Sequence, residues 1–420
     1  MGLFDKLLSR EKLGNYALAL DIGTEVVKAL VFEIDLEKGK GNIIGVGRER
    51  QKLGDMQSGG VTSIEGVVET SEKAILKAKK EAQILPDQVI LGIAGELVKG
   101  TTTTVHYERA KPKSKIDLSE LKNIIHKVQW KAFDKVRKQL SWETGHDEID
   151  VKLINAAIVD VKIDGYKITN PLGFQGKDVT VSIFNAFAPL IHLGALQTIA
   201  TELDMDLLSI AAEPYAVARC TGVEDSVEFS AIFIDVGGGT TDIAVVRNGG
   251  LEGTKMFALG GRAFTKRISN ELGTSFDEAE KLKLNYSNNS LQSDKMHKIK
   301  DILDSDCRVW LSGVELALSE FSNVDLLPTK IMLCGGGSVL PGIKSLLESS
   351  KWTKNLPFSR SPKVNFIKPG DVTNIHDQTH KLVDQQDITP MALANLAIDL
   401  AGEEDMVHGV LRKVVKMMQT

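Results

Sequence analysis

The sequence predicts an α/β protein made of two related halves, each with a strand, an acidic turn and a second strand. The run LALDIGT, which ends at Thr24, and the run IFIDVGGGTT, which ends at Thr241, share one pattern of apolar residues, aspartate and small residues. Strand patterns also alternate with amphipathic helical patterns along most of the 420 residues. This alternation is typical of helices that pack on a sheet.

Composition describes a globular chain with a large core and a weakly charged surface. The formal net charge is −5, and 42% of the residues are apolar. This balance argues against a surface devoted to nucleic acid or anionic lipid, so any such contact must be local. Cys220, Cys307 and Cys334 show neither a disulfide framework nor a zinc spacing. No run approaches the roughly 18 apolar residues of a membrane span. We therefore expect a cytoplasmic protein of two to four domains.

In chain order, the first half opens with two strand patterns around Asp21, followed by an amphipathic helix over 63–85. Residues 99–182 differ in composition from the segments before them, with a threonine run, a basic patch and a long helical pattern over 118–140. We expect them to form an inserted domain. Polar residues 285–295 read as a loop. Further helices are predicted over 191–203, 262–284, 299–321 and 390–401.

The repeated motif suits a phosphate and a cation. Its small residues let backbone N–H groups approach an anion, whereas a carboxylate beside that anion needs a cation between them. We expect Asp21 and Asp235 to hold Mg²⁺, through water. One copy alone is explained as well by an ordinary glycine-containing turn. Two copies, followed by the strand–glycine–helix junction CGGGSVLPG at 334–342, favour a nucleotide site. The lysine-containing phosphate loop and the dinucleotide glycine fingerprint do not match.

These motifs resemble those of the actin-like ATPase superfamily, with DIGT and DVGGGTTD as phosphate loops and CGGGSVLPGI as adenosine loop. Within it the chain is most similar to the bacterial cell-division family FtsA, whose pattern is echoed by NIIGVG (42–47), GGVTSIEGVVETSEKAI (59–75) and NPLGFQG (170–176). The resemblance implies a two-lobed fold of duplicated ribonuclease-H-like domains. It also implies an inserted FtsA-type α+β subdomain, the SHS2 domain.

The implied organisation begins and ends with short amphipathic segments. It comprises an N-terminal segment (1–14), a first nucleotide-binding lobe (15–98 and 183–215), the inserted subdomain (99–182), a second lobe (216–400, with an outer subdomain at about 262–325) and a C-terminal helix (401–420).

The resemblance implies that ATP and Mg²⁺ lie between the lobes. The phosphates and the metal would contact Asp21, Gly23, Thr24, Asp235, Gly237, Gly238, Gly239, Thr240 and Thr241. The adenosine would contact Glu280, Lys283, Gly335, Gly336, Gly337 and Ser338, although a plain amphipathic helix explains Glu280 and Lys283 as well. Glu213, in AAEPYA, matches the position that orients the attacking water, or else starts a helix before Pro214. Any hydrolysis should be slow, because no obvious arginine finger is present.

The two ends are basic and amphipathic. Val407, Val410, Leu411, Val414 and Val415 recur at helical spacing beside Arg412, Lys413 and Lys416. Such a helix can lie in a membrane interface or dock on the protein itself. Residues 1–14 could bind lipid in the same way, or form a frayed terminus.

The resemblance further implies a peripheral protein of the inner membrane surface that self-associates into polymers. It would tether FtsZ or other cell-division proteins at the septum, as part of the bacterial cytoskeleton, with no nucleic acid. FtsZ binding is its least secure implication, because the chain between Lys283 and the adenosine loop is shorter than in the family. A PilM-like adaptor of the type IV pilus platform is the alternative. A small-molecule kinase lacks a convincing sugar pocket, and a heat-shock chaperone would need a β-rich substrate domain.

Overall fold

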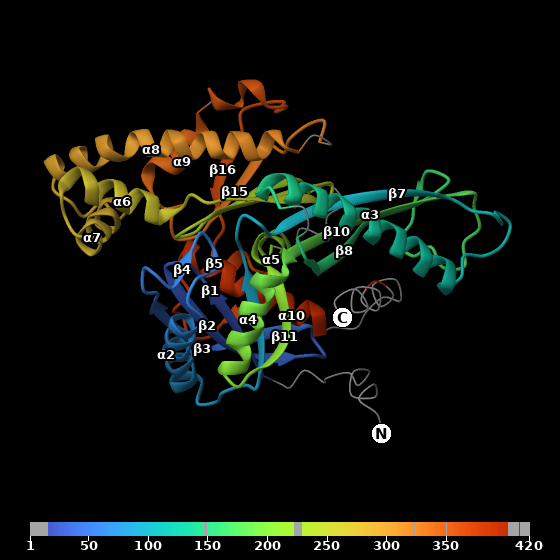
Figure 1. The fold of residues 1–420 in the computed structure, drawn as a ribbon, viewed down its shortest axis with the longest axis horizontal. Coiled ribbons are helices and arrows are strands. Elements are labelled where there is room, and N and C mark those ends of the chain that lie inside the picture. Colours follow the sequence, from blue (N-terminus) through green and yellow to red (C-terminus); the bar gives the residue numbers. More distant parts are fainter. Residues whose placement is uncertain are drawn as a thin grey trace.

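Two β-sheets with helices packed on both sides form the body of the protein in the computed structural model (Figure 1). The structure describes residues 16–146, 149–221, 229–321, 324–349, 351–401 and 411. The amphipathic segments predicted at 1–14 and 401–420 thus lie outside the described residues, apart from Ala401 and Leu411.

The first sheet carries the first acidic turn. Its strands run in the order β11 (Asp206–Ala212), β6 (Gln88–Ile93), β1 (Tyr16–Ile22), β2 (Val26–Asp35), β3 (Lys40–Arg50) and β17 (Ile375–Asp377). Strand β1, YALALDI, is buried at every position after Tyr16, because helices cover both faces of this sheet. One face packs against α2 (Ile64–Ala82) and α4 (Leu190–Glu202), and the other against α10 (Ile388–Ala401). A small hairpin, β4 (Met56–Gln57) and β5 (Gly60–Val61), precedes α2.

The second sheet carries the second acidic turn and the third glycine loop. Its first five strands are β16 (Lys363–Phe366), β15 (Lys330–Cys334), β12 (Ala231–Val236), β13 (Thr241–Arg247) and β14 (Gly250–Phe257). The outer helices are α6 (Gly261–Leu272), α7 (Phe276–Ser287), α8 (Ser293–Ser319) and α9 (Pro341–Glu348), and their core includes Trp310. The inner face packs against α5 (Glu213–Arg219), which in turn contacts α10. The single-turn helices are η2 (Trp352–Asn355), η3 (Pro369–Asp371) and η4 (Gln385–Asp387).

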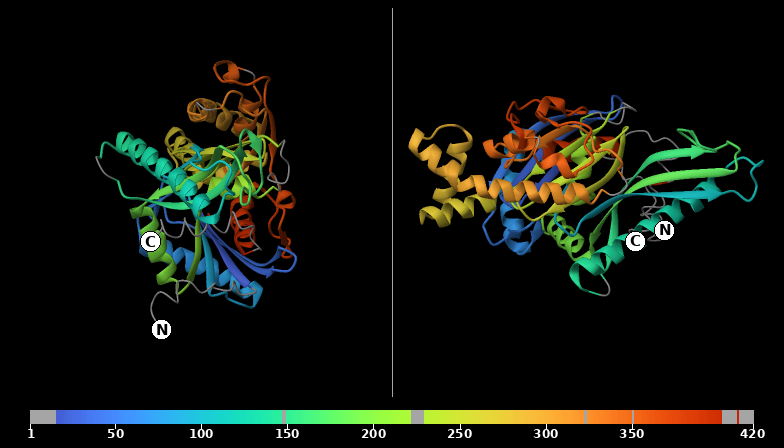
Figure 2. Two further views of the ribbon diagram at one scale, coloured as in Figure 1. Left: turned by 90° about the vertical axis from the view of Figure 1, so that its right-hand side faces the viewer. Right: turned by 90° about the horizontal axis from the view of Figure 1, so that it is seen from above.

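The inserted subdomain projects from one end of the body (Figure 1 and Figure 2). It contains β7 (Lys99–Glu108), α3 (Leu118–Thr144), β8 (Val151–Ile163), β9 (Tyr166–Lys167) and β10 (Asp178–Pro189). Its strands extend the second sheet, because β7 pairs with β14 at Thr101 and Gly253. Helix α3 is capped by the Asp117 side chain, which accepts from the Glu120 amide, and ends at Gly145 with φ of 70°.

Most helices predicted from periodicity are present, with shifted ends. Helices α2, α3, α4, α8 and α10 correspond to the patterns at 63–85, 118–140, 191–203, 299–321 and 390–401. The pattern over 262–284, however, is two helices. Helix α6 ends at Gly273, whose φ is 60°, and α7 starts with a capping box between Ser275 and Glu278. The predicted loop at 285–295 is shorter, because α7 and α8 extend into it.

The chain crosses back to the first sheet near its C-terminal end. Strand β17 pairs with β3, Ile375 opposite Gly41, and α10 packs on β1 and β2. Residues 375–400, which the sequence assigned to the second lobe, therefore pack with the first. The inserted subdomain likewise runs through β10 to Pro189, beyond the expected boundary at 182. The return of the chain to the first sheet could not be predicted from the sequence, because β17, the strand that makes it, has three residues and is too short to show a periodic pattern.

Candidate functional site

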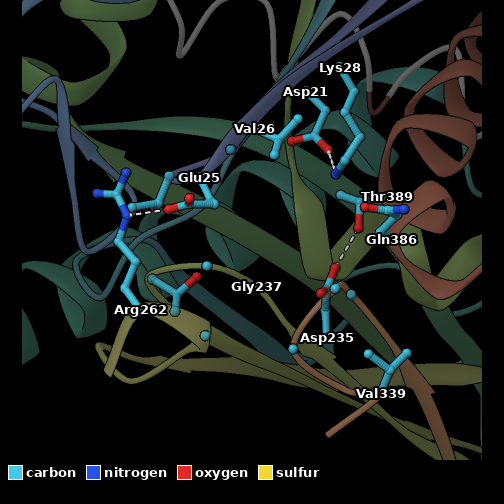
Figure 3. A pocket seen from close by; sticks show the side chains of 18 of the residues that line it. Asp21, Glu25, Val26, Lys28, Asp235, Gly237, Arg262, Val339, Gln386 and Thr389 are labelled. Atoms are coloured by element: carbon cyan, nitrogen blue, oxygen red, sulfur yellow. Dashed lines mark hydrogen bonds and ion pairs between the residues drawn. The ribbon is translucent and has the colours of Figure 1, made fainter. Parts of the chain in front are cut away.

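A cavity of about 360 Å³ lies between the two lobes and receives residues from both (Figure 3). Most of the residues predicted to bind nucleotide line it. They are Asp21, Gly23, Thr24, Glu213, Asp235, Gly237, Gly238, Thr240, Glu280, Lys283, Gly335, Gly336 and Gly337. The structure thus gathers segments more than 200 residues apart in the sequence around one space.

The two acidic turns approach each other closely at this cavity. Asp21 is the next-to-last residue of β1 and Asp235 the next-to-last residue of β12, and both are buried, with exposed fractions of 3% and 6%. A Cβ added at Gly239 would lie 2.7 Å from the Thr24 Oγ1 of the other lobe. Side chains larger than hydrogen at Gly239 would therefore push the two loops apart.

A lysine that the sequence analysis did not single out lies beside the first of these turns. Lys28, in β2, donates through Nζ to Asp21 Oδ2 at 2.9 Å. Burial alone would lower the pKa of Lys28, but the neighbouring Asp21 carboxylate outweighs burial and leaves that pKa raised. Lys28 thus stays protonated and supplies positive charge at the cavity wall. Its signal in the sequence was a lysine inside the apolar run VVKALVF.

Carboxylates outnumber this cation inside the site. Burial raises the pKa of Asp242 well above its ordinary value, and Asp235 adds to the rise. The pKa of Glu213 is also raised, first by burial and then by Asp21 and Asp242. Burial raises the pKa of Asp235 as well. Asp242 Oδ1 is buried without a hydrogen-bond partner among the described residues. A bound cation would relieve this accumulation of negative charge.

Asp235 is held by groups from two other segments. Its Oδ2 accepts a 2.5 Å hydrogen bond from Thr389 Oγ1, in the first turn of α10 (Figure 3). On its other side, Gly335 has a φ of 83°, and a Cβ there would lie 2.0 Å from Asp235 Oδ1. A glycine at 335 is therefore required both by the backbone conformation and by the space that Asp235 occupies. The role of Thr389 could not be read from the sequence.

Glu280 and Lys283 project from α7 into the same cavity. Lys283 Nζ contacts Glu280 Oε2 at 2.8 Å, Thr265 Oγ1 at 2.8 Å and the Gly261 carbonyl oxygen at 3.0 Å. An ammonium group has three N–H donors, so these partners use all of them. In this structure Lys283 therefore joins α7 to the start of α6, and a ligand contact would have to share or replace one of these bonds.

Three of the predicted site residues do not line the cavity. Gly239 packs against Thr24. Thr241 donates its hydroxyl to the Leu259 carbonyl at 2.7 Å and accepts from Trp310 Nε1 at 2.9 Å. Ser338 donates to the Gly335 carbonyl at 2.7 Å within its own loop. Thr241 and Ser338 thus form hydrogen bonds that stabilise the second phosphate loop and the third glycine loop, respectively, without lining the cavity.

An ion-pair network, here called the ionic clasp, forms part of the cavity wall. It consists of Glu25 and Arg50 from the first lobe and Arg262 and Asp277 from the second. Glu25 accepts from Arg50 Nε and Arg262 Nε, each at 2.7 Å, and Arg50 Nη1 donates to Asp277 at 2.8 Å. Arg262 Nη1 also donates to the Met56 carbonyl at 2.9 Å. The clasp therefore joins the lobes directly across the cleft.

The residues present fit a magnesium ion held mainly by a ligand and water. Asp21 and Asp235 line the cavity from opposite lobes, and one buried oxygen of Asp242 has no hydrogen-bond partner in the part of the chain that the structure describes. Within the described ranges, no group of three metal-ligating side chains forms a ready-made cage. Mg²⁺ commonly binds through one or two carboxylates, with waters and phosphate oxygens completing its octahedron.

Comparison with known proteins gives a consistent picture. A family model described as cell division protein FtsA matches residues 232–389. The cell division protein FtsA of Neisseria meningitidis serogroup B is 26% identical over 374 residues, which span 80% of this chain and 82% of that protein. The cell division protein FtsA of Streptococcus pneumoniae is 26% identical over 348 residues, or 78% and 72% of the two chains.

Among solved structures, a chain of the PilM–PilN type IV pilus biogenesis complex matches with a TM-score of 0.64 and 17% identity. The match covers 93% of this chain and 99% of that one. This likeness confirms the fold class predicted from the sequence.

Proposed function

Because this chain is related to the cell-division family FtsA and has the actin-like ATPase fold, we propose that it binds ATP with Mg²⁺ between its lobes. The resemblance drawn from the sequence motifs is confirmed by these relatives. The observation that carries the nucleotide proposal is the meeting of the Asp21 and Asp235 turns on one cavity, with a lysine beside them.

Each part of the cavity suits one part of the nucleotide. The glycine-rich turns offer backbone N–H groups to the phosphates, and Lys28 offers an ammonium group. Asp21 and Asp235 would hold Mg²⁺, which neutralises phosphate charge when it is bound. The loop from Gly335 to Gly337, with Leu340 and Leu284, offers a more apolar wall to adenosine.

Glu213 is the residue best placed to assist hydrolysis. It begins α5, lines the cavity, and has a pKa raised by burial and by neighbouring carboxylates. A carboxylate with a raised pKa accepts a proton from water more readily than an ordinary one. Arg50 and Arg262, which line the cavity, are both held at Nε by Glu25, while Arg262 Nη2 is buried without a hydrogen-bond partner among the described residues. Because either guanidinium would have to break its bond to Glu25 in order to move onto the phosphates, we expect turnover to be slow.

The cellular role that we propose is the FtsA-like one: self-association at the inner membrane surface and recruitment of division proteins such as FtsZ. The relatives named cell division protein FtsA support it. No helix of the described residues is both long and apolar enough to cross a bilayer. The membrane attachment that we propose is peripheral, with the predicted basic terminal segments as the first candidates.

Leu411 bears on how the C-terminal segment would attach. Leu411 belongs to the apolar stripe that we predicted to contact lipid. In the structure, however, it is 2% exposed and lies in a cluster with Ile124 of α3, Val161 of β8 and Val181 of β10. Burying a leucine contributes about 2 kcal/mol. Lipid must therefore compete with the inserted subdomain for this residue.

Nucleotide binding is tested by Asp235→Ala. Equilibrium titration with a fluorescent ATP analogue should show Mg²⁺-dependent binding by the natural chain and its loss in the variant. Asp301→Ala, an exposed carboxylate on α8, is the matched control and should bind normally. An affinity unchanged in Asp235→Ala would reject the assigned site.

The division role is tested by partner capture. An immobilised peptide from the FtsZ tail and one from a pilus membrane protein present the two candidate partners separately. Retention by the FtsZ peptide supports the proposed role. Retention by the pilus peptide alone would replace it with the PilM-like adaptor role.

A further inference from the structure

Helix α3 of the inserted subdomain is basic, although the whole chain is acidic. Its charged side chains are Lys122, Lys127, Lys131, Lys135, Arg137 and Lys138 against Glu120, Asp134 and Glu143. The excess continues before the helix, where Lys111, Lys113 and Lys115 are exposed. With a chain net charge of −5, this concentration of positive charge is local.

The acidic residues of α3 are already neutralised. Glu120 pairs with Arg109 at 2.8 Å, Asp134 with Lys138 at 2.7 Å, and Glu143 with Lys99 at 2.7 Å. The lysines beside them have other kinds of partner. Lys127 Nζ lies 4.6 Å from the centre of the Tyr107 ring, and Lys131 Nζ donates to the Thr104 carbonyl.

Neither Lys127 nor Lys131 meets a carboxylate within 4 Å in the part of the chain that the structure describes. Their positive charge is therefore available to a partner.

A tryptophan lies in the middle of this charge. Trp130 is 62% exposed and follows Lys127 by one helical turn. Its ring meets Phe133 edge to face at 5.7 Å, and Phe133 meets the buried Phe187 at 6.1 Å. The base of the tryptophan is thus braced against the subdomain core, while its outer surface faces solvent. We call Lys127, Trp130, Lys131, Asp134 and Lys138 the α3 face.

We propose that the α3 face lies on an anionic lipid surface. Lysines flank a tryptophan on a convex helix, and this shape suits a flat, negatively charged interface better than a peptide, which would need a groove. Tryptophan favours the level of the lipid headgroups, where its ring is partly apolar and its N–H stays wet. Each basic residue near such a surface contributes about 1 kcal/mol.

The position of α3 is compatible with this contact. The helix runs along the outside of the inserted subdomain in both views of Figure 2. Leu411 lies in the same apolar cluster as Leu121, Ile124 and Ile125 of α3. Leu411, which belongs to the segment proposed as a membrane anchor, therefore lies in the cluster beneath this helix. The inference rests on the proposed membrane attachment for its biological setting, but the contact itself can be measured separately.

In the test, the full chain is attached to vesicles through a tag, so that the result does not depend on the predicted terminal membrane-binding segments. A hexahistidine tag attaches it to nickel-chelating lipid in vesicles of either phosphatidylglycerol or phosphatidylcholine. Of its four tryptophans, Trp310 and Trp352 are buried, so Trp142→Phe leaves Trp130 as the only exposed one. Emission wavelength and quenching by brominated lipid then report on the α3 face.

On phosphatidylglycerol we expect a blue shift and quenching, both absent when Trp130→Phe is added. Lys127→Gln with Lys131→Gln should remove about 2 kcal/mol of attraction, equivalent to a roughly 30-fold weaker contact. The control Lys79→Gln with Lys80→Gln removes two exposed lysines from α2 and should change nothing.

Two results would overturn the inference: no quenching of Trp130 on the anionic vesicles, or equal quenching on both lipids. The absence of quenching would instead favour an acidic protein as the partner of the α3 face. Sedimentation of the untagged chain with the same vesicles tests the proposed attachment independently. If the chain sediments with the vesicles but Trp130 is not quenched, the proposed membrane attachment is supported and the contact through the α3 face is rejected.

Discussion

The ionic clasp predicts how fast nucleotide leaves the cavity. Glu25 binds Arg262 across the cleft and Arg50 within its own lobe, so Glu25→Gln weakens one contact between the lobes directly and also frees the Arg50 side chain that reaches Asp277. The Arg262–Glu25 pair is largely shielded, with exposed side-chain fractions of 16% and 19%. A charge-assisted hydrogen bond in such a setting contributes about 1.5–3 kcal/mol. The Arg50–Asp277 pair, exposed at 44% and 70%, contributes less than about 1 kcal/mol.

The expected kinetic effect follows from these energies. If opening limits release, a loss of about 2 kcal/mol accelerates dissociation roughly 30-fold in Glu25→Gln. Arg262→Ala should have a larger effect, because it also loses the bond to the Met56 carbonyl. Asp277→Asn should change the rate by only a few fold. Raising the salt concentration should narrow the differences.

Stopped-flow displacement of a fluorescent ATP analogue measures these rates. In a double-mutant cycle, Glu25→Gln and Arg262→Gln should be strongly non-additive, because the two side chains bond directly. Release from Glu25→Gln within twofold of the natural rate, or simple additivity of the two changes, would refute the idea that the clasp holds the cleft closed.

Three further predictions concern the walls of the cavity. Thr241→Val should lower the free energy of unfolding by about 1–3 kcal/mol, because it leaves the buried Trp310 Nε1 without its acceptor, while the nucleotide affinity stays within a few fold; denaturant titration and nucleotide binding on the same sample check both halves. Gly335→Ala should destabilise by more than about 1 kcal/mol and abolish nucleotide binding, because φ is 83° and the methyl group would meet Asp235; Gly54→Ala, where a Cβ meets nothing within 4 Å, should be neutral in thermal unfolding. Asp242→Asn should raise the melting temperature of the nucleotide-free chain at neutral pH. A carboxyl whose pKa is raised in the folded state binds its proton more tightly there, so its contribution to stability is present at low pH and is lost as pH rises above the unfolded pKa. The gain should therefore shrink toward pH 4, and a gain independent of pH would contradict the assignment.

The sequence predicted those parts of the site that lie on continuous motifs. Asp21 and Asp235 could be paired because their turns share one local pattern, and the third glycine loop follows a recognisable strand. Helices α2 and α3 were found because their buried residues repeat at helical spacing.

The remaining site residues depend on tertiary contacts that no local pattern encodes. Thr389 binds Asp235 of the second sheet although it belongs to α10, a helix that packs on the first sheet. Arg262 and Glu25 are ordinary charged residues until the lobes close and bring them within 2.7 Å. Thr241 belongs to a phosphate-loop motif, yet its hydroxyl is used by Leu259 and Trp310. A motif gives residue types, whereas each side chain's partners depend on the surrounding fold.

The contact between α5 and α10 has a consequence for domain motion. These two helices join the lobes at the back of the cleft, and both are rich in alanine, including the buried Ala216 and Ala218 in α5 and Ala392 and Ala394 in α10. Small side chains interlock little, so one helix can slide or pivot on the other with little loss of buried surface. We therefore expect the α5–α10 contact to permit rotation of the lobes. Most of the resistance to opening would then come from the ion pairs of the ionic clasp.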